Sequence, residues 1–130
     1  MLKRSILGVG AVVLLALPAV AQAQQMPMAE APEGKHATIT GTVIDLSCRF
    51  RFNLTGEQHR MCAQVCADNG IPLAILTSDG TLYVHISDGM PGNSQNAALR
   101  EYAEQQVSIT GMVYDAGGAK GIVIGEIKQS

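Results

Sequence analysis

Five short stretches of alternating residues, separated by turn signals, constrain the fold of this chain most. "ATITGTVIDL" (37–46) alternates β-branched residues with small or polar ones, which is typical of a strand with one buried face. "PLAILTS" (72–78) and "TLYVHIS" (81–87) flank Asp79-Gly80, a dipeptide that favours a hairpin turn. "QVSITGMVYD" (106–115) and "GIVIGEIK" (121–128) flank the glycine-rich "AGGAK". The pattern predicts five strands, in which the second pairs with the third and the fourth with the fifth.

Two of these stretches nearly repeat each other. "TITGTVID" (38–45) and "SITGMVYD" (108–115) differ at few positions, and each carries a glycine at its centre, Gly41 and Gly111. Glycine inside a strand marks a sharp bend or a close approach of another backbone. Since one recurrence cannot build a solenoid, we interpret the two stretches as strands that turn the corner of a barrel.

Two helices are predicted between the strands. The first runs from about Gly56 to Asn69, between strands one and two, with Thr55 and Gln58 spaced as a capping box and Pro72 after its end. The second, "NSQNAALREYAEQ" (93–105), lies between strands three and four. Three strands, a helix and two further strands follow the order of a five-stranded OB-type barrel, so we predict a mainly β fold of that type.

The first 23 residues have the composition of a secretory signal peptide. Lys3 and Arg4 precede an apolar run that ends at Pro18, and small residues at Ala21 and Ala23 are spaced for cleavage. We therefore expect a signal peptide at 1–23, a flexible leader at 24–36, and one domain at 37–130 with a Cys/His insertion at 48–70. The expected location is the bacterial periplasm or the exterior, after cleavage near Ala23.

Charge and composition limit the expected partners. The formal net charge is −2, and loss of the two basic residues of the signal peptide makes the remaining chain more acidic. An acidic domain without tryptophan is a poor candidate for nucleic-acid binding. We expect no integral membrane contact after cleavage. A protein partner on the barrel face remains open, as does an unidentified small-molecule ligand.

All three cysteines and one histidine lie in "CRFRFNLTGEQHRMCAQVC" (48–66). On the predicted helix, His59, Cys62 and Cys66 fall within an arc of about 60° and therefore point the same way. Cys48 follows the first strand, and the segment that joins it to His59 is long enough to fold back over that helical face. The spacing predicts a cluster of three sulfurs and one imidazole nitrogen.

A Cys3His set suits two metal ions. Zinc takes these four ligands tetrahedrally, which leaves no open position for a substrate water. Cuprous copper is equally compatible, because thiolates select it and two or three sulfurs suffice. We predict that Cys48, His59, Cys62 and Cys66 bind zinc or Cu(I), and we expect no catalytic residues and no enzymatic activity.

Two alternatives remain open for an exported protein with an odd number of cysteines. A disulfide from Cys48 to Cys62 or Cys66 would close a loop of 14 or 18 residues and stabilise the domain by roughly 3 kcal/mol. The protein would then be a disulfide-stapled ligand-binding or protein-interaction module without metal. A thiol-disulfide redox protein is the third reading; Arg49, Arg51 and Arg60 could lower a thiol pKa, but no C-x-x-C motif is present.

The motifs also carry a resemblance to known proteins. "ITGTVIDL", "SDGTLYVHIS" and "VSITGMVYDAGGAKGIVIGEIK" resemble segments of small exported bacterial OB-fold proteins, over most of residues 37–128. "HRMCAQVCADNGIPLAIL" is similar to an uncharacterised group of them that carries cysteine and histidine in a helical insertion. The resemblance implies an OB-type fold and export. It implies no particular ligand, because OB folds bind many unrelated ones.

Overall fold

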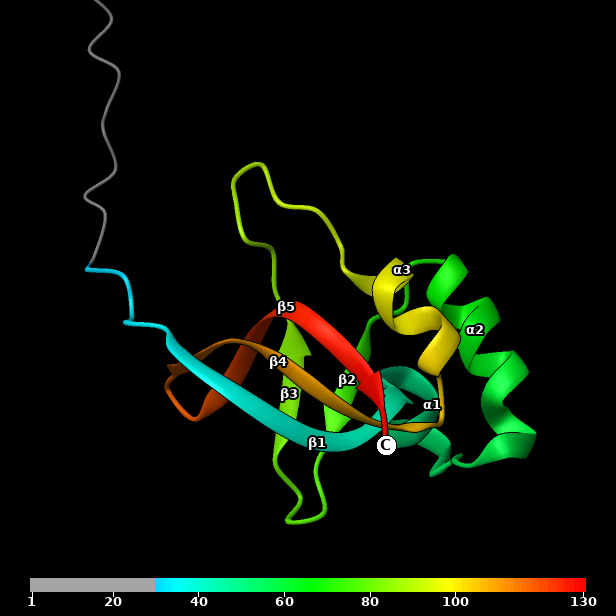
Figure 1. Ribbon diagram of the computed structural model, residues 1–130. Helices are drawn as coiled ribbons and strands as arrows, with labels where there is room; N and C mark the ends of the chain where they lie inside the picture. Colours follow the sequence, from blue (N-terminus) through cyan, green and yellow to red (C-terminus); the bar gives the residue numbers. More distant parts are fainter. Residues whose placement is uncertain (1–29) are drawn as a thin grey trace, which may run out of the picture.

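The computed structural model describes residues 30–130, in which five strands close into one barrel (Figure 1). The barrel order is β1-β2-β3-β5-β4, and all neighbouring strands are antiparallel except β3 and β5. The predicted signal peptide (1–23) lies outside the described residues. The strands are β1 (Lys35–Asp45), β2 (Leu73–Leu76), β3 (Leu82–His85), β4 (Gln106–Ala116) and β5 (Ala119–Gln129).

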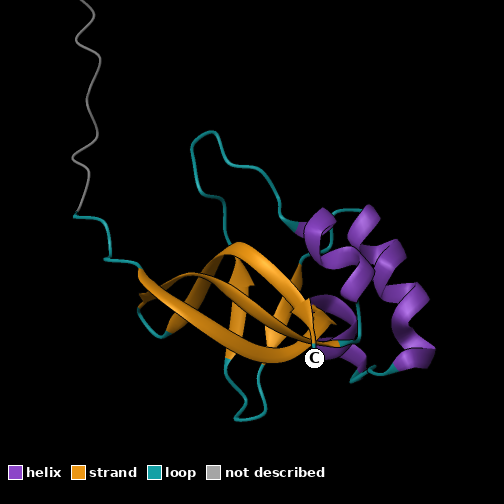
Figure 2. Cartoon of the chain, in the orientation of Figure 1, coloured by secondary structure: helices purple, strands orange, loops and turns teal. Residues whose placement is uncertain are grey.

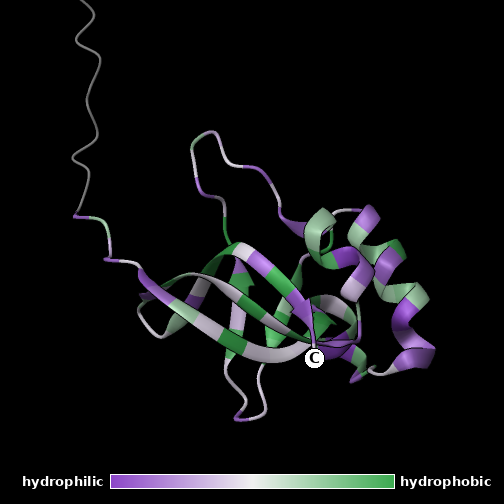
Figure 3. Cartoon of the chain, in the orientation of Figure 1, coloured by the Kyte–Doolittle hydropathy of each residue, from purple (hydrophilic) through white to green (hydrophobic). Residues whose placement is uncertain are grey.

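The mainly β fold and the five strands are confirmed. The two predicted hairpins, β2 with β3 and β4 with β5, both form. Hydrophobic and hydrophilic residues alternate along the strands (Figure 3), so each strand places one set of side chains inside the barrel. The buried core residues include Ile39, Val43, Leu73, Ile75, Val107, Ile109 and Ile122.

The two strand glycines lie where another backbone comes close, as predicted. A Cβ atom on Gly41 would lie 2.7 Å from the carbonyl oxygen of Leu76 on β2, and one on Gly111 would collide with the carbonyl oxygen of Val123 on β5. The pairing register of β4 and β5 shifts between Thr110 and Gly111. Any side chain at these positions would push neighbouring strands apart, so glycine allows the barrel to close.

The helices gather at one end of the barrel (Figure 2). The first, α1 (Leu46–Phe52), was not predicted. It begins because Asp45 caps it: the Asp45 Oδ1 atom accepts a hydrogen bond from the Cys48 backbone N–H at 3.0 Å. It ends at Asn53, which adopts a left-handed φ of 53° and donates its N–H to the Arg49 carbonyl.

The predicted helix over 56–69 is present in two parts. A 3-10 turn, η1 (Glu57–His59), precedes the α-helix α2 (Arg60–Asp68). The predicted capping box does not form: Gly56 is the N-cap residue of η1, and no side chain caps it. The Gly56 N–H instead donates to the Glu104 carboxylate, so a distant residue takes the place of the predicted Thr55 cap.

The second predicted helix is shorter than expected. It consists of α3 (Asn96–Leu99) and the 3-10 turn η2 (Arg100–Tyr102). The chain leaves the helical conformation at Ala103 because β1 pairs with it: Glu104 N–H donates to the Val43 carbonyl, and Val43 N–H donates to the Gln105 carbonyl. These backbone bonds direct residues 103–105 to the barrel end that carries α1 and α2.

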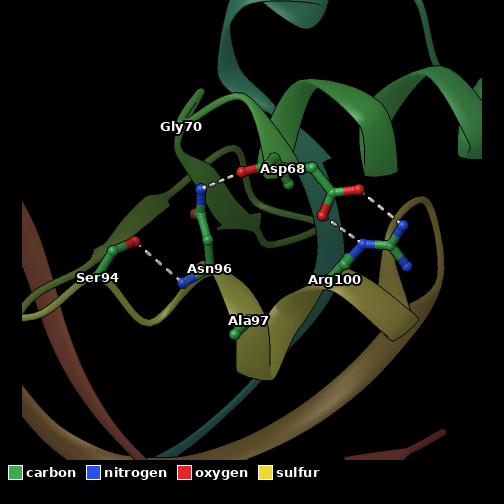
Figure 4. Close-up of a pocket in the computed structure, with 7 residues that line it drawn as sticks. Asp68, Gly70, Ser94, Asn96, Ala97 and Arg100 are labelled. Carbon is green, nitrogen blue, oxygen red and sulfur yellow. Dashed lines mark hydrogen bonds and ion pairs between the residues drawn. The ribbon is translucent and has the colours of Figure 1, made fainter.

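Asn96 joins the end of α2 to the barrel. Its side-chain amide donates to the carbonyls of Ala67 and Ile71, and its Oδ1 atom accepts from the Leu73 N–H on β2. Figure 4 shows this amide directed at the carboxyl end of α2, beside the exposed Asp68–Arg100 ion pair. Within residues 30–130, no helix is long and apolar enough to cross a bilayer.

We predict that Asn96→Ala lowers the free energy of unfolding by about 1–3 kcal/mol, because it leaves buried backbone groups without partners. Thermal unfolding followed by circular dichroism measures the change. Asn93→Ala is the matched control, because Asn93 is exposed and its hydrogen bond to Ser87 uses the backbone N–H. Equal unfolding midpoints for the two variants would contradict this role of Asn96.

Candidate metal centre

The three cysteines meet at the end of the barrel that carries the helices. Cys48 lies in α1, and Cys62 and Cys66 lie one turn apart in α2. The three Sγ atoms all lie within 4.8 Å of one another, and no disulfide joins them. Cys62 is exposed, whereas Cys48 and Cys66 are half-buried. Three free thiols therefore face one another, and solvent reaches them from the Cys62 side.

His59 lies beside Cys48. The imidazole is buried, and one ring nitrogen, the Cys48 sulfur and an Asp45 oxygen lie within 4.8 Å of one another. Among the described residues, the close groupings are therefore two, the three sulfurs and the Asp45–Cys48–His59 set, and they share Cys48. The structure thus brings all four predicted residues to one region, with Cys48 between His59 and the α2 cysteines.

Glu104 orients the imidazole of His59. The Glu104 Oε1 atom lies 2.8 Å from His59 Nδ1, and Oε2 accepts the Gly56 N–H at 2.8 Å. Both side chains are almost fully buried. When the Glu104 oxygen accepts this hydrogen bond, Nδ1 is the donor nitrogen of the imidazole. The other nitrogen, Nε2, is buried and has no hydrogen-bond partner within residues 30–130. A carboxylate on one imidazole nitrogen and a free second nitrogen is the usual arrangement of a histidine that binds metal.

Sequence reasoning missed Glu104. It is 45 positions away from His59 in the sequence, and no local pattern distinguishes it from the exposed acidic residues. Its backbone adopts a positive φ of 61°, which is unfavourable for a residue other than glycine. The hydrogen bonds to β1 hold it in this conformation, so only the folded barrel reveals its role.

Asp45 has a different role from the one its sequence position indicates. An aspartate at the end of a strand is typical of a turn facing solvent, but this one is fully buried. Its Oδ1 atom caps α1, and Oδ2 has no hydrogen-bond partner of regular geometry in the described part of the chain. Asp45 therefore adds a buried carboxylate to the donors of this region.

The carboxylate of Asp45 opposes ionisation of the nearby thiols. The pKa of Cys66 is raised to about 12, first because its thiol acts as a donor toward Asp45, then by burial and by the negative charge of Asp45. The pKa of Cys48 is also raised, mainly by burial and then by the charge of Asp45. A thiol with a raised pKa is a poor nucleophile at neutral pH, which disfavours the redox reading.

The arginines near the cysteines do not offset the rise in the thiol pKa values of Cys48 and Cys66. Arg60 lies 3.6 Å from Glu57 and donates a hydrogen bond to the Glu101 carbonyl at 2.7 Å. The guanidinium of Arg51 lies over the Phe52 ring. The cluster thus gathers thiols and a carboxylate without an arginine paired to them among the described residues. A metal cation supplies the missing positive charge in such a set and deprotonates the thiols that bind it.

The two other histidines lie elsewhere. His85 Nε2 contacts Asn96 Oδ1 at 2.8 Å and belongs to the structural contacts around α3. His36 is exposed near the start of β1. Neither belongs to a close grouping of metal-binding side chains in residues 30–130.

Comparison with protein-family models, curated proteins and solved structures found no match to this chain. The fold and the site therefore define its class by themselves. It is a mainly β protein whose closed five-stranded barrel carries a helical cluster of three cysteines and a buried histidine. That donor set could hold a metal ion.

We predict that Cys66 of the reduced, metal-free protein reacts slowly with iodoacetamide near pH 7 and faster as the pH rises toward its raised pKa, because only the thiolate is nucleophilic. Tandem mass spectrometry of tryptic peptides gives the rate for each cysteine, because fragment ions separate Cys62 from Cys66 within the shared peptide 61–100. Asp45→Asn, which removes the nearby negative charge, lowers the pKa and raises the rate at a given pH. A fast rate that does not change between about pH 7 and about pH 9 would contradict a raised pKa.

Proposed function

We propose that this chain is an exported metal-binding module. The thiolates of Cys48, Cys62 and Cys66 bind one thiophilic ion, zinc or Cu(I), and His59 provides a nitrogen donor beside Cys48. The observation that carries the proposal is the meeting of three unbridged Sγ atoms within 4.8 Å of one another. The buried and unpaired Nε2 of His59 supports it.

The distances suit coordination after small side-chain rotations. Two sulfurs that each lie about 2.3 Å from one ion are separated by at most about 4.6 Å. The cluster is already near this limit without an ion. Cys62 and Cys66 are four residues apart on α2, so one helical face presents both sulfurs, and α1 presents the third. Exposure of Cys62 gives an ion access without opening of the barrel.

The OB-type classification and the compartment are part of the proposal. The barrel order β1-β2-β3-β5-β4, with a helical segment between β3 and β4, supports the OB-type label. The predicted signal peptide supports a periplasmic or secreted location. In this reading the barrel is a rigid support, and the helical segment between β1 and β2 carries the metal.

The second candidate is a disulfide-stapled module, which the proximity of the three cysteine sulfurs also favours. Oxidation would join Cys48 to Cys62 or Cys66 with little movement, since their sulfurs lie within 4.8 Å. Such a protein would retain one free thiol and would leave the His59–Glu104 pair without a function at the cluster. The metal reading uses all of these groups and is therefore preferred.

We predict that the reduced protein binds one zinc or Cu(I) ion per chain under anaerobic conditions, and that replacing all three cysteines, Cys48, Cys62 and Cys66, by serine abolishes uptake. Elemental analysis after desalting measures the ion, and a thiol assay in denaturant counts three thiols. Met90→Ser is the control, because Met90 is a sulfur residue that is 98% exposed and lies outside the cluster. A protein that takes up no metal after full reduction would contradict the proposal. If the protein as purified also contains one free thiol and one disulfide, the disulfide module is correct.

We further predict that Glu104→Gln weakens zinc binding by about 10- to 100-fold, because the neutral amide no longer holds the imidazole as a carboxylate does. Competition with a zinc-sensitive dye measures the affinity. Glu101→Gln is the matched control, since Glu101 is exposed on the neighbouring turn. Unchanged affinity in a folded Glu104→Gln variant would show that Glu104 does not support a ligand.

A further inference from the structure

Two buried polar atoms near Cys48 have no hydrogen bond of regular geometry among the described residues, although the Cys66 thiol acts as a donor toward the Asp45 carboxylate. Asp45 Oδ2 and His59 Nε2 each lack a regular hydrogen bond within residues 30–130. Asp45 is fully buried, and the exposed fraction of the His59 residue is 6%. Both residues belong to the group whose donor atoms lie within 4.8 Å of one another and of the Cys48 sulfur. An oxygen, a nitrogen and a sulfur donor thus meet at a buried point.

We propose that Asp45, Cys48 and His59 form a metal subsite of their own, which binds a divalent ion such as Zn2+, whereas Cu(I) binds the three sulfurs of Cys48, Cys62 and Cys66. The two subsites share the Cys48 sulfur. This inference rests on the proposed metal-binding function and changes its donor set for zinc: the divalent ion uses Cys48 and His59 together with Asp45, and only Cu(I) uses all three sulfurs.

The cost of the unpaired atoms supports the subsite. A buried polar group without a partner costs about 1–3 kcal/mol, and a charged group costs more. Capping of α1 does not account for this cost, because the cap uses only Oδ1 and an asparagine would serve equally well. Likewise, the bond to Glu104 uses only Nδ1 of His59. A cation held by Asp45, Cys48 and His59 would give both the carboxylate and the imidazole a further partner.

The chemistry of the donors separates the two ions. Zinc binds carboxylate oxygen, imidazole nitrogen and thiolate sulfur at similar distances of about 2.0–2.3 Å. Cuprous copper prefers soft sulfur ligands and gains little from a carboxylate. The oxygen–nitrogen–sulfur group therefore suits the divalent ion, and the group of three sulfurs suits Cu(I). Three protein ligands leave one position of a tetrahedral zinc ion for water or another ligand.

Hydrogen bonds from neighbouring residues also orient the Asp45–Cys48–His59 group for binding an ion. Glu104 fixes the orientation of the imidazole, and the Cys48 N–H fixes the Asp45 carboxylate through Oδ1. Each of these two donors thus has one atom held by a hydrogen bond, as is usual for ligands of a metal site. Cys62 differs from them, because it is exposed and belongs only to the three-sulfur group.

Two variants separate the subsites. Asp45→Asn keeps an oxygen for the α1 cap and removes the anionic ligand, and Cys62→Ser removes a sulfur that only the Cu(I) subsite uses. Dissociation constants for Zn2+ and for Cu(I) are measured by chelator competition under anaerobic conditions. We expect Asp45→Asn to weaken zinc binding at least about tenfold without weakening Cu(I) binding, because loss of the Asp45 charge makes the thiols of the Cu(I) subsite easier to deprotonate. Cys62→Ser is expected to weaken Cu(I) binding at least about tenfold and to leave zinc affinity within about twofold. Asp88→Asn, an exposed carboxylate, is the control.

The outcomes distinguish failure of the separate zinc subsite from failure of metal binding itself. If Cys62→Ser weakens both ions equally, or Asp45→Asn weakens neither, one shared site exists and the inference is wrong while metal binding stands. If the reduced wild-type protein binds neither ion, both fail. Should Asp45→Asn not fold, Co2+ replaces zinc as a probe: its sulfur-to-cobalt charge-transfer band should be the same in the wild-type protein and in Cys62→Ser, and a band that weakens in Cys62→Ser would overturn the subsite.

Discussion

The hydrogen bonds of Glu104 connect the barrel to the helices that carry the cysteines. Its backbone pairs with β1, while its carboxylate binds the Gly56 N–H and His59 Nδ1 at the start of α2. One side chain therefore sets both the beginning of η1 and the orientation of the imidazole. The unfavourable left-handed backbone of Glu104 is maintained because the neighbouring residues 103 and 105 are also held by β1.

Asp45 makes the corresponding connection at the other side of the cluster. It is the last residue of β1 and the N-cap of α1, so it places Cys48 in the first turn of that helix. Its second oxygen remains buried beside the thiols. The barrel end thus holds two carboxylates, one behind the histidine and one beside the cysteines. In our account the first orients a ligand, and the second is itself a ligand for a divalent ion.

The fold and part of the site could be predicted because they depend on local patterns. Alternation and the Asp79-Gly80 turn predict the strand pairs, and glycine inside a strand predicts the close backbone contact at Gly41. The proximity of Cys62 and Cys66 follows from helical spacing. By contrast, α1 depends on a cap from Asp45, whose position at the end of a strand predicts only a turn. The role of Glu104 depends on a contact between distant segments. Spacing along the chain contains no information about such contacts.

X-ray absorption spectroscopy of the protein loaded with each ion in turn identifies the atoms that bind Cu(I) and zinc. We expect a Cu(I) ion surrounded by sulfur alone, and a zinc ion with oxygen or nitrogen neighbours at about 2.0–2.1 Å beside sulfur at about 2.3 Å. A copper or zinc ion without any sulfur neighbour would show that the cysteine cluster is not a metal site and would contradict the account.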